Sequence, residues 1–368
     1  MSGGVDSAVA ALLLRRQGMR VTGVFMKNWE EDDQEGYCAA AEDLRSAEAV
    51  CRRLDIPLRT VNFSSEYWER VFARFLEEYR CARTPNPDVL CNTEIKFNAF
   101  LEHALSLGAD GIATGHYAGV GEREGNYMLL KAKDAQKDQT YFLHGIGQKE
   151  LEKTLFPLAG LNKAEVRAIA RDAGLPNPER PDSTGICFIG ERPFKTFLKR
   201  FLPAEPGDIL SIDGHRKGRH DGLMYYTIGQ RHGLGVGGPG GPWYVAGKDT
   251  DKNILYVVEG GDHPALYSGA LMAGPIHWVS GKPPELPLYC SAKTRYRQPD
   301  QKCRVEPLDG ARVRVVFDRP QRAVTPGQYV VFYSGTICLG GGIIDTALAA
   351  ADEPASREAQ PLETADTD

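Results

Sequence analysis

The sequence of 368 residues predicts an α/β domain with a parallel β-sheet, followed by two smaller β-rich domains. Three observations lead to this prediction. Short apolar runs alternate with amphipathic segments over the first 200 residues, which is typical of a parallel sheet covered by helices on both faces. After about residue 203 the sequence changes to short alternating strands separated by Gly, Pro and Asp. The chain also opens on Ser2-Gly3-Gly4, a glycine-rich turn directly before a helical segment.

Each element of the first domain follows from its local pattern. Helices are expected where apolar residues recur at helical spacing, and several of them end at a glycine. Strands are expected where short apolar runs lie between these helices. The expected helices cover 6–18, 39–55, 66–80, 95–108 and 163–174, and the expected strands cover 20–26, 58–63 and 111–117.

The remaining chain has the composition of all-β domains, with a turn residue every few positions. We expect an α/β domain over 1–200, a small β-rich central domain over 201–266 and a C-terminal β-barrel over 267–348. The acidic segment 349–368 is expected to be disordered, because it is rich in Pro, Ala and acidic residues.

Composition sets the broad class of the protein. Hydrophobic residues make up 42% of the chain and charged residues 25%, as in ordinary globular proteins. No apolar run reaches the roughly 18 residues that a membrane span needs, and the N-terminus lacks a signal-peptide pattern. We therefore expect a cytoplasmic protein.

The distribution of charge is more informative than the net charge of −5. That value alone argues against a nucleic-acid partner. However, residues 351–368 hold six acids and one arginine, so the rest of the chain is close to neutral. Residues 280–325 carry ten Lys and Arg against five Asp and Glu. This segment could attract phosphates, or it could be an ordinary solvated β surface.

The opening loop has the chemistry of a phosphate site. Gly3 and Gly4 let backbone N–H groups approach an anion, and the positive end of the following helix points at the same place. Ser2 and Ser7 add hydroxyl groups, and Asp6 could hold a Mg²⁺ ion that bridges phosphates. The alternative is a flexible start in which Asp6 or Ser7 only caps the helix.

Two of the eight cysteines stand out by their neighbours. Cys91 follows a proline-constrained loop and is expected at the start of a helix, where the thiol pKa is lowered. Cys187 lies in a loop flanked by glycines, which leaves room for a partner. Either residue could instead be a structural thiol. No two cysteines have C-x-x-C spacing, so neither a zinc ribbon nor a thioredoxin-type pair is indicated.

The segment SGGVDS (2–7) is the signature of the PP-loop ATP pyrophosphatases, and further segments resemble one branch of them, the tRNA-specific 2-thiouridylases. The resemblance runs in order from residue 1 to about residue 345. The segments that carry it are FMKNWEEDD (25–33), RTPNPDVLCNTEIKF (83–97), IATGHY (112–117), KDQTYFL (137–143), DSTGICFIGER (182–192), GLMYYTIGQRHGLG (222–235), TRYRQ (294–298), VTPGQYVVFY (324–333) and CLGGG (338–342).

The resemblance implies a fold of the adenine nucleotide alpha-hydrolase type and a reaction, ATP-dependent 2-thiolation of the wobble uridine of tRNA. In it, the uracil C2 oxygen is adenylated and then replaced by sulfur from a cysteine persulfide, with release of AMP and pyrophosphate. By resemblance, Cys91 is the nucleophile and Cys187 carries the persulfide. Cys91 either attacks the persulfide, leaving a transient Cys91–Cys187 disulfide, or attacks C2 itself. Asp88 could be a general acid/base or a plain loop-capping residue.

The resemblance also implies the binding residues and partners. The ATP site comprises Met1, Ser2, Gly3, Gly4, Val5, Asp6, Ser7, Met26 and Gly115, and the target-base site comprises Asn86, Pro87 and Asp88. The tRNA-contacting residues are His116, Lys137, Asp138, Gln139, Arg295, Tyr296 and Gln328. The implied tRNAs are those for Lys, Glu and Gln, and the sulfur donor is a cysteine desulfurase or a sulfur-relay protein. Besides ATP and Mg²⁺, no permanent metal or organic cofactor is expected.

The sequence departs from the family pattern at its beginning. Family members carry a central β-strand before the glycine loop, whereas this sequence begins inside the motif. We therefore expect the first strand of the sheet to be lacking here and the natural protein to begin upstream. Two other functions stay open: another PP-loop adenylating ligase, and a non-catalytic RNA-binding protein if the start is truly truncated.

Overall fold

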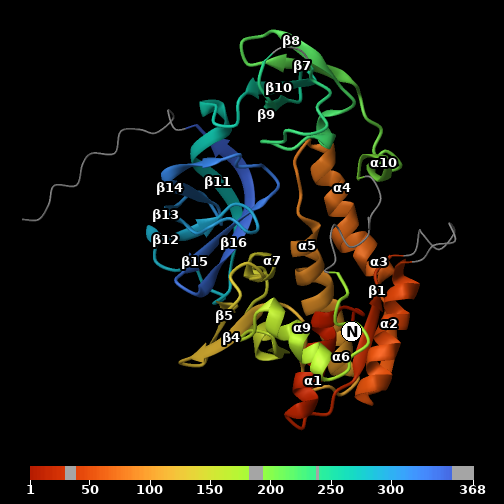
Figure 1. The fold of residues 1–368 in the computed structure, drawn as a ribbon. Helices are drawn as coiled ribbons and strands as arrows, with labels where there is room; N and C mark the ends of the chain where they lie inside the picture. Colours follow the sequence, from red (N-terminus) through yellow and green to blue (C-terminus); the bar gives the residue numbers. More distant parts are fainter. Residues whose placement is uncertain (30–38, 182–193, 238–239, 350–368) are drawn as a thin grey trace, which may run out of the picture.

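The structure is a computed structural model that describes residues 1–29, 39–181, 194–237 and 240–349. It has three parts (Figure 1): an α/β domain at the bottom of the view, a small sheet at the top and a barrel on the left. The predicted fold class is confirmed. The predicted tail over 350–368 lies outside the described residues.

The α/β domain contains most of the helices. In chain order its elements are α1 (Val5–Arg16), β1 (Gly23–Lys27), α2 (Ala39–Leu54), β2 (Leu58–Asn62), α3 (Ser64–Tyr67), a π-helical segment (Trp68–Phe72), α4 (Ala73–Arg80), α5 (Pro87–Leu90), a second π-helical segment (Cys91–Ala99), α6 (Phe100–Ser106), β3 (Ile112–Ala113), β4 (Ala118–Arg123), β5 (Asn126–Lys131), α7 (Thr140–Leu143), α8 (Gln148–Glu152), β6 (Thr154–Leu155), α9 (Lys163–Asp172) and α10 (Phe194–Leu198).

Its described parallel strands form two separate pairs, β1 with β2 and β3 with β6. The predicted strand over 111–117 is wrong beyond Ala113. The backbone leaves the strand there because Gly115 packs on the first turn of α1, where an added Cβ would lie 2.8 Å from Asp6 C and Ser7 N. The sequence pattern could not show this, since it depends on two segments that are far apart in the chain.

The hairpin of β4 and β5 was not predicted from the sequence. It lies inside the predicted α/β domain, yet β5 pairs with the last barrel strand, with Leu129 opposite Cys338. The hairpin thereby extends the barrel sheet into the first domain. Leu129 and Cys338 are both buried in the apolar cluster that this junction shares.

The rest of the chain is β-structure, as predicted. The central sheet has the order β8-β7-β10-β9, and the barrel has the order β11-β14-β13-β12-β15-β16, closed by the pairing of β11 with β16. The central strands are β7 (Gly207–Ser211), β8 (Arg216–His220), β9 (Trp243–Asp249) and β10 (Ile254–Glu259). The barrel strands are β11 (Tyr267–Trp278), β12 (Leu288–Lys293), β13 (Gln301–Pro307), β14 (Val313–Arg322), β15 (Tyr329–Ser334) and β16 (Ile337–Leu348).

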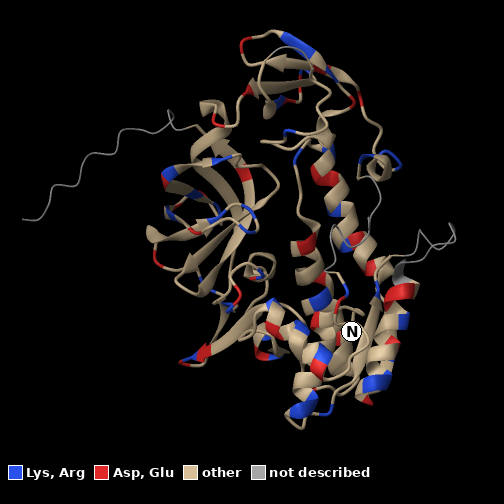
Figure 2. Ribbon diagram, viewed as in Figure 1, with Lys and Arg blue, Asp and Glu red and all other residues tan. Residues whose placement is uncertain are grey.

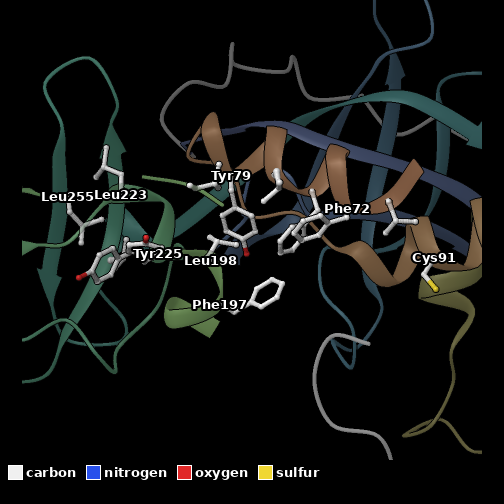
Figure 3. Packing of buried hydrophobic residues seen from close by; sticks show 14 of the residues in the cluster. Phe72, Tyr79, Cys91, Phe197, Leu198, Leu223, Tyr225 and Leu255 are labelled. Carbon is white, nitrogen blue, oxygen red and sulfur yellow. The ribbon is translucent and has the colours of Figure 1, made fainter. Parts of the chain in front are cut away.

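One apolar cluster joins the central sheet to the catalytic candidate Cys91. Figure 3 shows it running from Leu255 in the central sheet, past Phe197 and Phe72, to Cys91. Met26, at the end of β1, packs against the same cluster. Because protein interiors are close-packed, a shift of the central domain would be transmitted to the helix that carries Cys91.

All three parts meet at residues 82–85, the segment between α4 and α5. Lys248 of the central sheet donates a hydrogen bond to Ala82 O (2.6 Å). Gln328 of the barrel donates to Thr84 O (2.7 Å) and Pro85 O (3.3 Å). We call this set of contacts the 82–85 clasp. It fixes the backbone directly before the helix that begins at Pro87.

The junction of α7 with the barrel contains a buried histidine. His144 is 2% exposed, and its Nδ1 lies 2.8 Å from Tyr141 O, which a neutral imidazole satisfies by donating its proton. Burial lowers the pKa of His144 from 6.5 to about 4, and the hydrogen bond only partly opposes this. Protonation is therefore easier in the unfolded chain than in the folded one.

This difference predicts a loss of stability in mild acid. The contribution of His144 is complete above its unfolded pKa of 6.5 and is lost as the pH falls towards 4. Between pH 7 and pH 5 the loss is about 2 kcal/mol of unfolding free energy. His144→Asn, which keeps a donor for Tyr141 O, should show a shallower fall in urea unfolding over this range. The exposed His215→Asn should retain the wild-type slope, and equal slopes for all three proteins would contradict the assignment.

Candidate functional site

The opening loop ends at Gly4, which is the N-cap of α1 and makes no side-chain cap bond. The alternative that Asp6 or Ser7 caps the helix is therefore wrong, since both lie inside α1. Ser2 Oγ lies 3.1 Å from Ser7 Oγ, and Ser7 Oγ donates to Gly4 O at 3.0 Å. The two hydroxyls and the first N–H groups of α1 thus lie together at the positive end of a helix, which is a favourable place for phosphate.

Gly3 is held by residues far away in the sequence. Its φ is +78°, and an added Cβ would lie 2.5 Å from Asp43 O. Its carbonyl oxygen accepts hydrogen bonds from Ser46 Oγ (2.8 Å), Asn177 Nδ2 (2.6 Å) and Arg180 Nη1 (3.1 Å). The loop conformation is therefore imposed by α2 and by the segment after α9, and only glycine fits.

Asp6 is paired with a lysine that the sequence analysis missed. Lys163 Nζ lies 2.7 and 2.8 Å from the two carboxylate oxygens of Asp6, and Tyr117 Oη donates to Oδ1 at 2.9 Å. Lys163 is the first residue of α9, where the helix dipole disfavours a cation. A lysine directly after a capping residue, Asn162, was the signal that an acidic partner lies nearby.

The helix that carries the predicted nucleophile begins earlier than expected. Asn86 is its N-cap, with Oδ1 accepting from Asp88 N, and Pro87 is its first residue. Cys91 therefore lies more than one turn inside the helix, and the prediction that it occupies the N-terminus is wrong. The N-terminal effect on thiol pKa fades within the first turn, so it does not act fully on Cys91. Cys91 is instead 1% exposed and packed in the apolar cluster.

Asp88 and Cys91 are three residues apart on this helix and share a face. Burial raises the pKa of the Asp88 carboxyl, and the positive charge of Lys96 opposes this only in part. A raised pKa brings a carboxyl group closer to the pH range in which it can accept and return a proton. This favours the acid/base interpretation of Asp88 over a plain cap, because Asn86 supplies the cap.

Lys96 connects Asp88 to the ATP side of the site. The positive charge of Lys96 lowers the pKa of His116 as well as that of Asp88. His116 is 8% exposed, and burial, reinforced by Lys96, places its pKa well below 6.5. His116 Nδ1 lies 2.9 Å from Thr114 Oγ1. The preceding Gly115 rests on the first turn of α1, so a neutral His116 lies between the glycine loop and the Cys91 helix.

The segment Lys137–Gln139 was predicted to contact tRNA. Gln139 hydrogen-bonds both backbone groups of Tyr117, at 2.9 and 2.8 Å, and thereby joins the Tyr117–Asp6 pair. Asp138 is 4% exposed and accepts bonds from Ala132 N and Thr140 Oγ1. Its side chain is thus buried and hydrogen-bonded inside the protein. Lys137 is partly exposed.

The barrel residues that were predicted to contact tRNA likewise make contacts inside the protein. Arg295 donates to Ile228 O (3.0 Å), Ala323 O (2.7 Å) and Thr325 Oγ1 (3.1 Å), so it connects the barrel to the central domain. Tyr296 is partly buried against Phe142, with ring centroids 4.4 Å apart. Gln328 belongs to the 82–85 clasp.

The basic segment 280–325 presents only part of its charge to solvent. Lys293, Arg304 and Arg314 form ion pairs with neighbouring acids. Figure 2 shows basic positions spread over several strands and turns of the barrel. The exposed Lys and Arg of this segment are Lys282, Arg297, Lys302, Arg312 and Arg319.

The predicted persulfide residue Cys187 lies outside the described residues. Within the described part of the chain, no group of three or more His, Cys, Asp or Glu could hold a metal ion. No helix there is long and apolar enough to cross a membrane.

The fold and this site define a PP-loop nucleotide-binding enzyme domain joined to two β-domains. Family models match all three parts: a tRNA methyl transferase HUP domain over residues 1–191, a tRNA methyl transferase PRC-barrel domain over 195–259 and an aminomethyltransferase beta-barrel domain over 268–344.

Curated relatives match almost the whole chain. The tRNA-specific 2-thiouridylase MnmA of Methylococcus capsulatus is 61% identical over 352 residues, covering 94% of this chain and 95% of the relative. The MnmA proteins of Geobacillus thermodenitrificans and Legionella pneumophila are each 59% identical, covering 94% of this chain and 93% and 97% of the relatives. The chain belongs to the tRNA-specific 2-thiouridylases, which are ATP-using sulfurtransferases. This decides against the ligase and the non-catalytic alternatives.

The Asp6–Lys163 pair predicts an effect on ATP binding. In Lys163→Met the Asp6 carboxylate loses its counter-ion beside the phosphate loop, and we expect ATP to bind about 10- to 100-fold more weakly, or about 1.4–2.8 kcal/mol. Calorimetric titration with ATP measures this. Lys133→Met is the matched control, because Lys133 pairs on the surface with Glu165 of the same helix. Equal affinities for both variants would exclude a role for the pair.

Proposed function

We propose that this protein catalyses the ATP-dependent 2-thiolation of the wobble uridine of tRNA. The observation that supports it most directly is one connected site: the first turn of α1, directly after the glycine loop, contacts Gly115, and the ring of the next residue, His116, lies 5.8 Å from the ring of Phe97 on the Cys91 helix. Adenylation takes place on O2 and sulfur transfer on C2 of the same uracil. The ATP-binding residues and the sulfur-transfer residues therefore have to lie next to each other.

In the first step, the uracil O2 attacks the α-phosphorus of ATP, and pyrophosphate leaves from the glycine loop. The loop N–H groups and the end of α1 stabilise the departing charge. Attack through O2 leaves a proton on N3 that has to be removed, and we assign this proton to Asp88. His116 is neutral at the working pH and adds no charge beside the phosphates.

In the second step, the terminal sulfur of a Cys187 persulfide attacks C2, and AMP leaves with the former O2. The Cys91 thiolate then attacks the inner sulfur of Cys187. The sulfur–sulfur bond breaks, sulfur remains on C2, the proton held by Asp88 returns to N3, and a Cys91–Cys187 disulfide forms.

The remaining assignments complete the proposal. Mg²⁺ would enter with the phosphates of ATP, and Asp6 offers a carboxylate of suitable chemistry that it would share with Lys163. Asn86 and Pro87 would border the target base. Exposed Arg297 and the partly exposed Lys137 and Tyr296 would contact the tRNAs for Lys, Glu and Gln. A cysteine desulfurase or a relay protein would supply sulfur, and we expect the enzyme to act in the cytoplasm.

The two cysteines provide the test. In Cys91→Ser and in Cys187→Ser, we expect 2-thiouridine formation to fall to background, while a single turnover of tRNA-dependent pyrophosphate release continues because adenylation needs neither thiol. Mass spectrometry of digested tRNA and a pyrophosphate assay measure the two steps separately. Cys81→Ser is the control, since Cys81 is an exposed thiol. Thiolation by a protein with serine at both 91 and 187 would overturn the proposal.

A further inference from the structure

Two of the barrel thiols that the reaction does not use lie on neighbouring strands. Cys290 of β12 and Cys303 of β13 face each other across neighbouring antiparallel strands, as a direct register pair between Tyr289–Arg304 and Ser291–Lys302. Their sulfur atoms are 3.8 Å apart. Directly opposed residues of an antiparallel pair have the short Cβ separation that a disulfide needs.

The two thiols differ in access. Cys303 is 3% exposed and is part of the apolar core of the barrel. Cys290 is partly exposed and packs against the same core. A small reagent therefore reaches Cys290 first. The hydrogen bond from Cys303 favours the thiolate of Cys290 and lowers its pKa, whereas the same bond raises the pKa of Cys303.

The two cysteines flank a turn that carries residues predicted to contact tRNA. Between the two cysteines the chain forms the turn that carries Arg295, Tyr296 and Arg297. Arg295 anchors this turn to the central domain, and Arg297 is exposed. A covalent bond at the base of the hairpin would hold both strands in register next to this turn.

We propose that Cys290 and Cys303 are a thiol-modification site that is converted to a reversible cross-strand disulfide by a low-molecular-weight disulfide such as oxidised glutathione. The Cys290 thiolate attacks the glutathione disulfide, forms a mixed disulfide and releases one glutathione thiolate. The Cys303 thiol then loses its proton and attacks Cys290 Sγ. The bond to glutathione breaks, and the second glutathione leaves as a thiolate that takes up that proton. Two protein thiols are oxidised, and one glutathione disulfide is reduced to two thiols.

The chemistry predicts different products in matched variants. The full-length protein is incubated with oxidised glutathione, alkylated and mapped by mass spectrometry without reduction. The wild type should give a peptide pair linked through Cys290 and Cys303, and dithiothreitol should separate it. Cys303→Ser should instead accumulate glutathione on Cys290, because the second thiol is missing. In Cys290→Ser the buried Cys303 should stay unmodified.

Stability supplies the second measurement. Because closing the hairpin restricts the unfolded chain, the thermal midpoint of the wild type should rise by about 3–8 °C on oxidation. The midpoint of Cys303→Ser should not rise, and Cys81→Ser should respond like the wild type. Accumulation of the same glutathione adduct on Cys290 in the wild type and in Cys303→Ser would overturn the proposal. So would a wild type in which both thiols remain free under a large excess of oxidised glutathione.

Discussion

The 82–85 clasp is the constraint on which the site depends. This short segment has no regular structure of its own, yet Lys248 and Gln328 reach its carbonyl oxygens from two different domains. Each such hydrogen bond contributes about 1 kcal/mol, and together they fix the start of the helix that carries Asp88 and Cys91. An enzyme that moves sulfur between two cysteines and a base needs this kind of fixed geometry, because misplacement by about 1 Å can cost about a hundredfold in rate.

On the other side of the site, the glycine loop is likewise held by side chains from distant segments of the chain. Gly3 is fixed by three donors from α2 and from the segment after α9, and Asp6 by Lys163. Between the two fixed elements, burial shifts the pKa of Asp88 upward and that of His116 downward. In the proposed reaction the two groups would have separate tasks, a carboxyl that exchanges protons and an imidazole that stays neutral.

The sequence was sufficient for the fold class, the order of the domains and the family. These properties depend on local periodicity and on contiguous motifs such as the glycine loop and the Cys91 segment. It was insufficient where a feature depends on distant contacts. The hairpin of β4 and β5 joins the barrel through β16, and β3 ends early because Gly115 approaches α1. Lys163 was recognisable only by its unfavourable place at the start of α9.

The motif residues show the same division. A family motif identifies positions, but it does not distinguish a residue that touches the substrate from one that holds the protein together. Arg295 and Asp138 carry the charges expected at an RNA surface or a polar site, yet both are used inside the protein. The start of the helix is a further example. Because the helix begins at Pro87 rather than near Cys91, its N-terminal effect on the Cys91 thiol is weaker than expected.

Gly327 offers the most direct test of the clasp. Its φ is +90°, and an added Cβ would lie 2.9–3.0 Å from the backbone of Thr84, whereas Gly335, with φ +57°, has open space around it. The measurement is the single-turnover rate of 2-thiouridine formation at saturating ATP and tRNA. Gly327→Ala should lower this rate about 10- to 100-fold while the protein stays folded and binds tRNA, and Gly335→Ala should not. Equal rates for the two variants would contradict the claim that the barrel positions the catalytic helix.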